Sequence, residues 1–79
     1  MIVRIQFTNG KSGEYEIYGE REDLGEVYEE IDSAYKYHRS IYAYKAFYGA
    51  STGKYSTRTP CLHFIINPAH VVLIEVIEE

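Results

Sequence analysis

The chain of 79 residues carries 12 acidic and 8 basic residues, a formal net charge of −4, and 46% apolar residues. This length allows one domain, so we expect residues 1–79 to fold as a single domain. The apolar content is typical of folded globular proteins rather than disordered tails. A single cysteine excludes an internal disulfide, and no apolar run approaches the roughly 20 residues that span a membrane. The sequence therefore predicts a small, soluble, cytoplasmic protein.

The charge is divided between two adjoining stretches. Residues 14–32 contain nine acidic residues and one arginine. Residues 33–59 contain five of the eight basic residues, six of the nine tyrosines and no acidic residue. Any function proposed for the chain has to use or explain this division, because the net charge describes neither half.

Two strands are predicted at the start of the chain. Apolar and polar residues alternate over residues 2–8, which is typical of a half-buried strand. Asn9-Gly10 is a strong hairpin signal, and residues 14–19 are predicted to form the second strand.

The register of this hairpin follows from its apolar pattern. We expect Val3 to pair with Ile17 and Ile5 with Tyr15, because this register keeps the apolar residues on one face of the sheet. Such a pairing predicts a loop of three or five residues, or a bulge at Gly13.

Residues 23–37 are predicted to form the one helix. Apolar residues recur there at positions i, i+3, i+4, i+7 and i+11, which is typical of an amphipathic helix. Asp23 is the expected N-cap, and Glu26, three residues later, completes a capping-box pattern. The predicted buried stripe consists of Leu24, Val27, Tyr28, Ile31 and Tyr35.

The remainder of the chain is predicted to be β-structure. Residues 41–48 alternate with a period of two and are rich in tyrosine, which suits a strand. Residues 51–60 are expected to form a turn that continues as a loop. Residues 61–66 and 71–77 form two further predicted strands, joined by a turn at residues 67–70.

The predicted element order, ββαβββ, indicates an α+β fold in which one amphipathic helix packs on a mainly antiparallel five-stranded sheet. A small curled β-barrel capped by the helix is the alternative. The last strand is apolar on both faces, so we expect it at the centre of the sheet or in a self-association surface. Residues 65–79, IINPAHVVLIEVIEE, resemble the final hairpin of many small bacterial and phage proteins.

Aromatic and basic side chains are interleaved on the predicted strand at residues 41–48 and at the end of the helix. Nucleic-acid bases stack on tyrosine rings with about 1–3 kcal/mol each, while lysine and arginine neutralise phosphates. This combination suggests a face that binds single-stranded nucleic acid. The alternative is a protein contact or ordinary packing, because tyrosine is common in both. The candidate residues of this face are Tyr37, Arg39, Tyr42, Tyr44, Lys45 and Tyr48.

Five acidic residues fall within ten residues of the predicted helix. At 1.5 Å per residue this gives about one negative charge per 3 Å, close to the 3.4 Å per phosphate of one DNA strand. We expect these residues to bind a basic partner surface, and an ordinary solvated helix face is the alternative. The candidate residues are Asp23, Glu26, Glu29, Glu30 and Asp32.

No motif for catalysis or for cofactor binding is recognisable in the sequence. Cys61, His63 and His70 are the only group that suggests a metal, but they lack the ligand spacing of known zinc sites. We therefore expect no enzymatic activity, no cofactor and no bound metal.

The combined prediction is a non-enzymatic protein-interaction module, an acidic inhibitor or adaptor that masks a basic, nucleic-acid-binding surface of a partner protein. In size and charge the chain is similar to DNA-mimic inhibitors of phages and mobile elements, including those of the anti-CRISPR type, and the analogy implies this inhibitory role. The tyrosine-rich face would make a second contact, including one with another copy of the chain in a homodimer. The alternative function is a single-stranded nucleic-acid-binding module.

Overall fold

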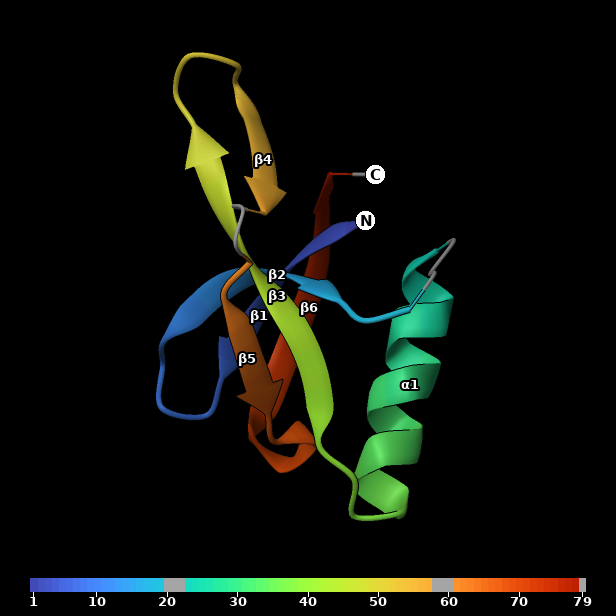
Figure 1. The fold of residues 1–79 in the computed structure, drawn as a ribbon. Coiled ribbons are helices and arrows are strands. Elements are labelled where there is room, and N and C mark those ends of the chain that lie inside the picture. The colour runs from blue at the N-terminus through green and yellow to red at the C-terminus, as the bar shows by residue number, and fades with distance from the viewer. Residues whose placement is uncertain (20–22, 58–60, 79) are drawn as a thin grey trace.

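The computed structural model describes residues 1–19, 23–57 and 61–78. One helix packs on a sheet of six strands, and every strand pair in these ranges is antiparallel. The predicted α+β class is confirmed, and because the sheet is open the barrel alternative is not supported. The elements in chain order are β1 (Ile2–Phe7), β2 (Ser12–Ile17), α1 (Leu24–Lys36), β3 (Ile41–Gly49), β4 (Lys54–Thr57), β5 (His63–Ile66), the 3-10 turn η1 (Pro68–His70) and β6 (Val71–Glu78) (Figure 1).

The strands follow the order β4-β3-β2-β1-β6, and β5 also pairs with β3. The last two strands therefore do not form the expected hairpin, since β5 pairs with β3 and β6 pairs with β1. The expected central position of the last strand is also wrong, because β6 ends the sheet. The physical reason lies in η1, where Asn67 Oδ1 accepts a hydrogen bond from the Ala69 N–H (3.0 Å) and the chain passes from β5, beside β3, to β6, beside β1.

Strand β4 replaces part of the predicted loop. The chain turns at Gly53, which has a φ of +70°, and returns alongside β3, so that Tyr55 pairs with Tyr48. Contacts distant in sequence hold this short polar strand. The Tyr55 N–H donates to the Glu78 carboxylate, and the Tyr55 hydroxyl accepts from Arg4 Nη2 at 3.4 Å. Residues 58–60 of the predicted loop lie outside the described residues.

The first hairpin has a three-residue turn at residues 8–10, one of the two predicted loop lengths. Gly10 has a φ of +83°, the left-handed conformation that this turn requires and that glycine adopts without strain. Val3 consequently pairs with Tyr15, two residues from the predicted partner Ile17. The predicted face of each residue is still correct, because a shift of two residues leaves every side chain on its own side.

Gly13 lies directly beneath the Tyr15 ring. A Cβ atom at Gly13 would lie 2.7 Å from Tyr15 Oη and 2.9 Å from two ring carbons. The ring is held by edge contacts with Phe7 and Phe64, whose centroids lie 6.2 and 5.7 Å away. Glycine is therefore needed here for close packing.

We expect Gly13→Ala to lower the free energy of unfolding by about 1–3 kcal/mol, because the Tyr15 ring has to leave its packed position. Urea denaturation measures the loss. In a Tyr15→Ala background the same substitution should cost almost nothing. An equal loss in both backgrounds would show that the contact with Tyr15 is not the cause.

Helix α1 begins after Asp23, whose side chain accepts a hydrogen bond from the Glu26 N–H (3.0 Å), as the capping pattern predicts. Its buried residues are Val27, Ile31 and Ala34. The predicted burial of Tyr28 and Tyr35 is wrong, because these side chains are 46% and 61% exposed. Ala34, which the apolar pattern did not include, lies against the sheet instead and allows the helix to approach it closely.

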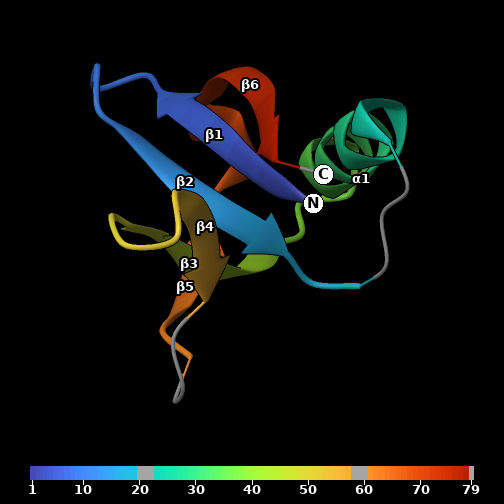
Figure 2. The same cartoon turned by 90° about the horizontal axis from the view of Figure 1, so that it is seen from above.

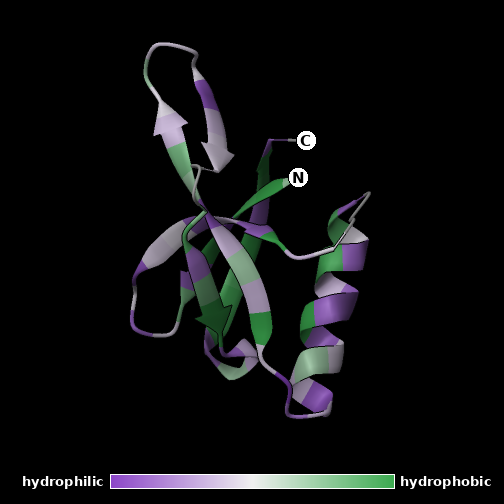
Figure 3. Cartoon of the chain, viewed as in Figure 1, coloured by the Kyte–Doolittle hydropathy of each residue, from purple (hydrophilic) through white to green (hydrophobic). Residues whose placement is uncertain are grey.

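The core lies between α1 and one face of the sheet. Apolar residues dominate β1, β5 and β6, whereas α1 alternates between apolar and polar residues along its length (Figure 3). Seen from above, α1 lies to one side of the twisted sheet (Figure 2). No helix of the described ranges combines the length and apolar character that membrane crossing requires. The core cluster consists of Val3, Ile5, Tyr15, Ile17, Val27, Ile31, Ala34, Ile41, Ala43, Ile66 and Ile74.

Candidate functional site

Four aromatic side chains gather on the sheet face opposite the core. Tyr42 and Tyr44 alternate on β3 with the core residues, so both point away from the helix. Tyr18 follows β2, and its N–H donates to the Tyr42 carbonyl (3.0 Å). This hydrogen bond brings the two residues side by side. His63 of β5 lies opposite Tyr44. We refer to Tyr18, Tyr42, Tyr44 and His63 as the tyrosine cluster.

The tyrosine cluster is closely packed around one ring. The Tyr18 and Tyr44 rings are stacked, with centroids 4.4 Å apart and an interplanar angle of 23°. Tyr42 and His63 lie 6.1 and 5.7 Å from the Tyr18 ring, and the Tyr18 hydroxyl hydrogen-bonds to His63 Nδ1. Tyr42 is 53% exposed. The result is an ordered aromatic surface that a partner can reach.

Tyr48 and Tyr37 lie apart from this cluster. Tyr48 is further along β3, where its ring makes an edge contact with Tyr55 of β4 (5.2 Å). Tyr37 caps the C-terminal end of α1, and the Lys36 ammonium lies 5.5 Å from its ring centroid. Both are exposed, as predicted, but the candidate nucleic-acid face is divided among three places.

The two candidate cations of that face are engaged in internal contacts. Arg39 forms an ion pair with Glu30 (3.4 Å) and donates to Ser33 Oγ (2.8 Å). Lys45 points to the opposite side of β3 from the tyrosine cluster, where its Nζ lies 5.0 Å from the Tyr15 ring centroid. Because neither cation points toward it, the tyrosine cluster is aromatic without being strongly basic. On the core side of the sheet, burial, together with the nearby Glu14 carboxylate, raises the pKa of Tyr15.

The five acidic candidates of α1 divide into three roles. Asp23 caps the helix, and Glu30 pairs with arginine as described. At 3.6 residues per turn, Glu29 lies about 180° from the centre of the buried residues, with Glu26 and Asp32 about 120° to either side of that centre. Glu29 and Asp32 are exposed and Glu26 is half-buried. These three residues, spaced i, i+3 and i+6, form what we call the acidic ridge.

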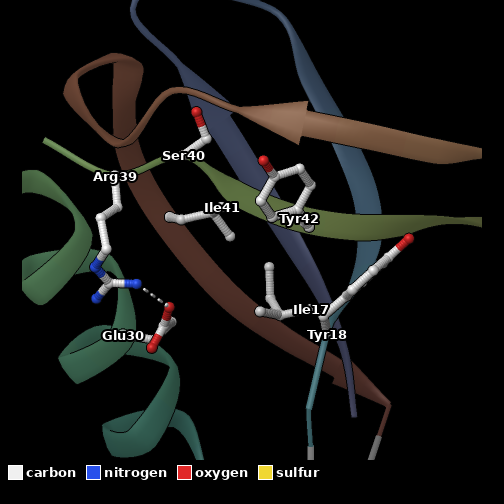
Figure 4. Close-up of a pocket in the computed structure, with 7 residues that line it drawn as sticks. All are labelled: Ile17, Tyr18, Glu30, Arg39, Ser40, Ile41 and Tyr42. Atoms are coloured by element: carbon white, nitrogen blue, oxygen red, sulfur yellow. Dashed lines mark hydrogen bonds and ion pairs between the residues drawn. The ribbon is translucent and has the colours of Figure 1, made fainter.

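A cavity of about 350 Å³ lies where α1 approaches the end of β2 and the start of β3 (Figure 4). The Arg39–Glu30 ion pair lies on the helix side of this cavity, whereas Tyr18 and Tyr42 belong to the strand ends and alternate with the core residues. These core residues, Ile17 and Ile41, are buried. The lining residues are Ile17, Tyr18, Glu30, Arg39, Ser40, Ile41 and Tyr42.

A comparison with known protein families, curated proteins and solved structures found no match.

The sequence-based prediction did not include Tyr18 or His63 in the site. The strand period did place Tyr18 on the polar face of its strand, and that was the available signal. The pairing of β3 with both β2 and β5, which brings the four rings together, could not be predicted from the sequence.

In residues 1–19, 23–57 and 61–78, no three His, Cys, Asp or Glu side chains are grouped so that they could hold a metal ion.

Proposed function

We propose that this chain is a non-enzymatic protein-interaction module that binds a basic partner surface through the acidic ridge. The observation that carries the proposal is the position of Glu26, Glu29 and Asp32 on the outer side of α1, away from the sheet. In the finer form of the proposal, the module is an inhibitor or adaptor that masks a nucleic-acid-binding surface, as a DNA mimic of a phage or mobile element would do.

The spacing of the acidic ridge supports this proposal. Consecutive members rise about 4.5 Å along the helix axis, three residues at 1.5 Å each, and side chains at i, i+3 are neighbours. Like charges at such spacing destabilise a helix by about 0.2–0.5 kcal/mol per pair, so helix stability alone does not favour them. A row of carboxylates does accelerate encounter with a positively charged partner and excludes negatively charged ones.

A matched pair of charge reversals tests the proposal. Glu29→Lys should weaken binding of a partner captured from the protein's own cells by about fivefold at low salt, equivalent to about 1 kcal/mol. Glu75→Lys makes the same change of charge at an exposed site on β6 and should leave the affinity nearly unchanged. Titration calorimetry measures both affinities, and circular dichroism checks both folds. Equal weakening by the two substitutions would mean that only net charge matters and would contradict the proposal.

Single-stranded nucleic-acid binding is the second candidate, and the exposed Tyr42 ring beside the stacked Tyr18 and Tyr44 rings favours it. Fluorescence titration with labelled DNA and RNA oligonucleotides should then show an affinity that falls steeply with salt. Tyr42→Ala should weaken that affinity by removing about 1–3 kcal/mol of stacking. An absence of binding at low salt would eliminate this candidate.

A further inference from the structure

Strand β6 leaves one of its two backbone edges without a neighbouring strand. It pairs with β1 on one side, and no strand of the described residues pairs with it on the other. The Ile74 carbonyl points to the free side, where it accepts a hydrogen bond from the Tyr28 hydroxyl (3.2 Å). In an antiparallel ladder the N–H and C=O of one residue point the same way, so the Ile74 N–H also faces the free side. A carbonyl oxygen accepts two hydrogen bonds, which leaves one position for an incoming strand.

Apolar side chains are exposed on both faces of this edge. On the side of α1, a groove of about 410 Å³ separates the helix from β6, and eight of the nine residues that line it carry no charge. Tyr28, Tyr35 and Val72 line this groove and are exposed. Leu73 pairs with Gln6 on the opposite face of the sheet and is exposed as well. Lysine and proline commonly protect an edge strand from pairing, and β6 contains neither.

The charge of β6 selects a register for pairing with a second copy. The ladder with β1 is regular from Leu73 to Val76, between two register shifts. Two antiparallel registers keep three opposed pairs of residues within this stretch, one centred on Ile74 and the other on Glu75. The second register places two carboxylates opposite each other, which destabilises a sheet. The first places Glu75 opposite Leu73 and opposes no like charges, so in this register the strand is complementary to itself.

We propose that two copies of this chain pair through the free edges of β6, antiparallel, around a twofold axis at Ile74. Each Ile74 N–H donates to the Ile74 carbonyl of the other copy, and the two sheets join into one. A twofold pairing uses the same surface of both copies, so it covers the exposed apolar residues of both edges and closes without a third copy. The pairing does not use the outer side of α1 and is independent of the acidic ridge.

A matched pair of substitutions at Leu73 tests the register. We expect the wild-type chain to show a monomer–dimer equilibrium in analytical ultracentrifugation. Leu73→Asp places a second carboxylate opposite Glu75 at two symmetric positions of the dimer, whereas Leu73→Lys places an ammonium group there. The Kd for dimer dissociation should therefore be at least about fivefold higher in Leu73→Asp than in Leu73→Lys. Circular dichroism checks both folds, which should be intact because Leu73 is exposed.

Disulfide crosslinking tests the pairing itself, in a Cys61→Ser background that removes the native free thiol. Leu73 and Glu75 of the other copy form a non-hydrogen-bonded pair, whose Cα atoms lie about 4.5 Å apart and within reach of a disulfide. Two copies of the same position lie diagonally, about 7–8 Å apart, which is too far. A mixture of Leu73→Cys and Glu75→Cys should therefore form a disulfide-linked dimer under mild oxidation, much faster than either variant alone.

Three results would overturn the inference. A wild-type chain that stays monomeric up to about 1 mM would remove the pairing and leave the edge to a strand of another protein. Equal Kd values for Leu73→Asp and Leu73→Lys would remove the register. Equally fast disulfide formation in the mixture and in the separate variants would place a different surface at the interface. Failure of the proposed function is measured separately, because Glu29→Lys should leave this dimer unchanged and contacts of Glu75 within the dimer join two copies of the same chain.

Discussion

Ile5→Ala is expected to lower the free energy of unfolding by about 2–5 kcal/mol, the range for large-to-small substitutions in a packed core. Ile5 is 0% exposed and belongs to the core cluster between β1, β6 and α1. For a domain of this length the total stability is about 4–12 kcal/mol, from about 0.05–0.15 kcal/mol per residue. One substitution therefore removes a large fraction of the stability.

The matched control is Ile65→Ala, which makes the same chemical change at a side chain that is 69% exposed. We expect it to change the unfolding free energy by less than about 0.5 kcal/mol. Urea denaturation of the two variants measures the difference directly. Similar losses in both would contradict the described placement of Ile5 in the core.

The second large effect is expected at Ala34, which is fully buried where α1 meets the sheet. Ala34→Asp places a carboxylate without a partner in the core and should cost about 3–5 kcal/mol. Tyr35→Asp introduces the same residue one position later, where the side chain is exposed. It should cost less than about 1 kcal/mol.

This pair of substitutions separates the structure from the apolar pattern of the sequence. The pattern predicts that Tyr35 is buried, so that Tyr35→Asp would be the damaging change. The structure predicts the reverse order. Thermal or urea unfolding decides between them, and a larger loss in Tyr35→Asp would show that the helix is rotated relative to the sheet. The loss of helix propensity from alanine to aspartate accounts for at most about 0.7 kcal/mol, so the rest of the difference reports burial.

The difference at Tyr35 shows where helical periodicity stops being informative. Tyrosine is apolar enough to be counted in a stripe, yet its size suits the rim of a helix–sheet contact. The Tyr28 hydroxyl, for example, donates to the Ile74 carbonyl of β6 at 3.2 Å. Alanine is too small to signal burial in a sequence, although the closest approach of a helix to a sheet requires such a residue. Local signals were more reliable, and the Asp23 cap was predicted correctly.

The sheet was predictable in its faces but not in its pairing. Alternation assigned Val3 and Tyr15 to the same side, whereas their exact partners depended on the turn at Gly10. Strand β4 is short and polar, and it is held by contacts with Arg4 and Glu78 that no local pattern contains. Pairing between distant segments depends on the whole fold.

The candidate site was likewise predictable where it depends on a local pattern and unpredictable where it depends on strand pairing. The outward position of Glu29 and Asp32 could be predicted from the helical period. The tyrosine cluster could not, because Tyr18 and His63 reach it only through the pairing of β2 and β5 with β3. The contact between Arg39 and Glu30 likewise depends on the left-handed turn at His38.

The central claim is that the acidic ridge contacts a basic partner, and site-specific photo-crosslinking in the protein's own cells tests it most directly. A crosslinking amino acid replaces Glu29 in one variant and Glu75 in another, and the crosslinked proteins are identified by mass spectrometry. The account predicts crosslinks from position 29 to a basic surface of one partner, with few from position 75. Crosslinks to that partner from position 75 and none from position 29 would contradict it.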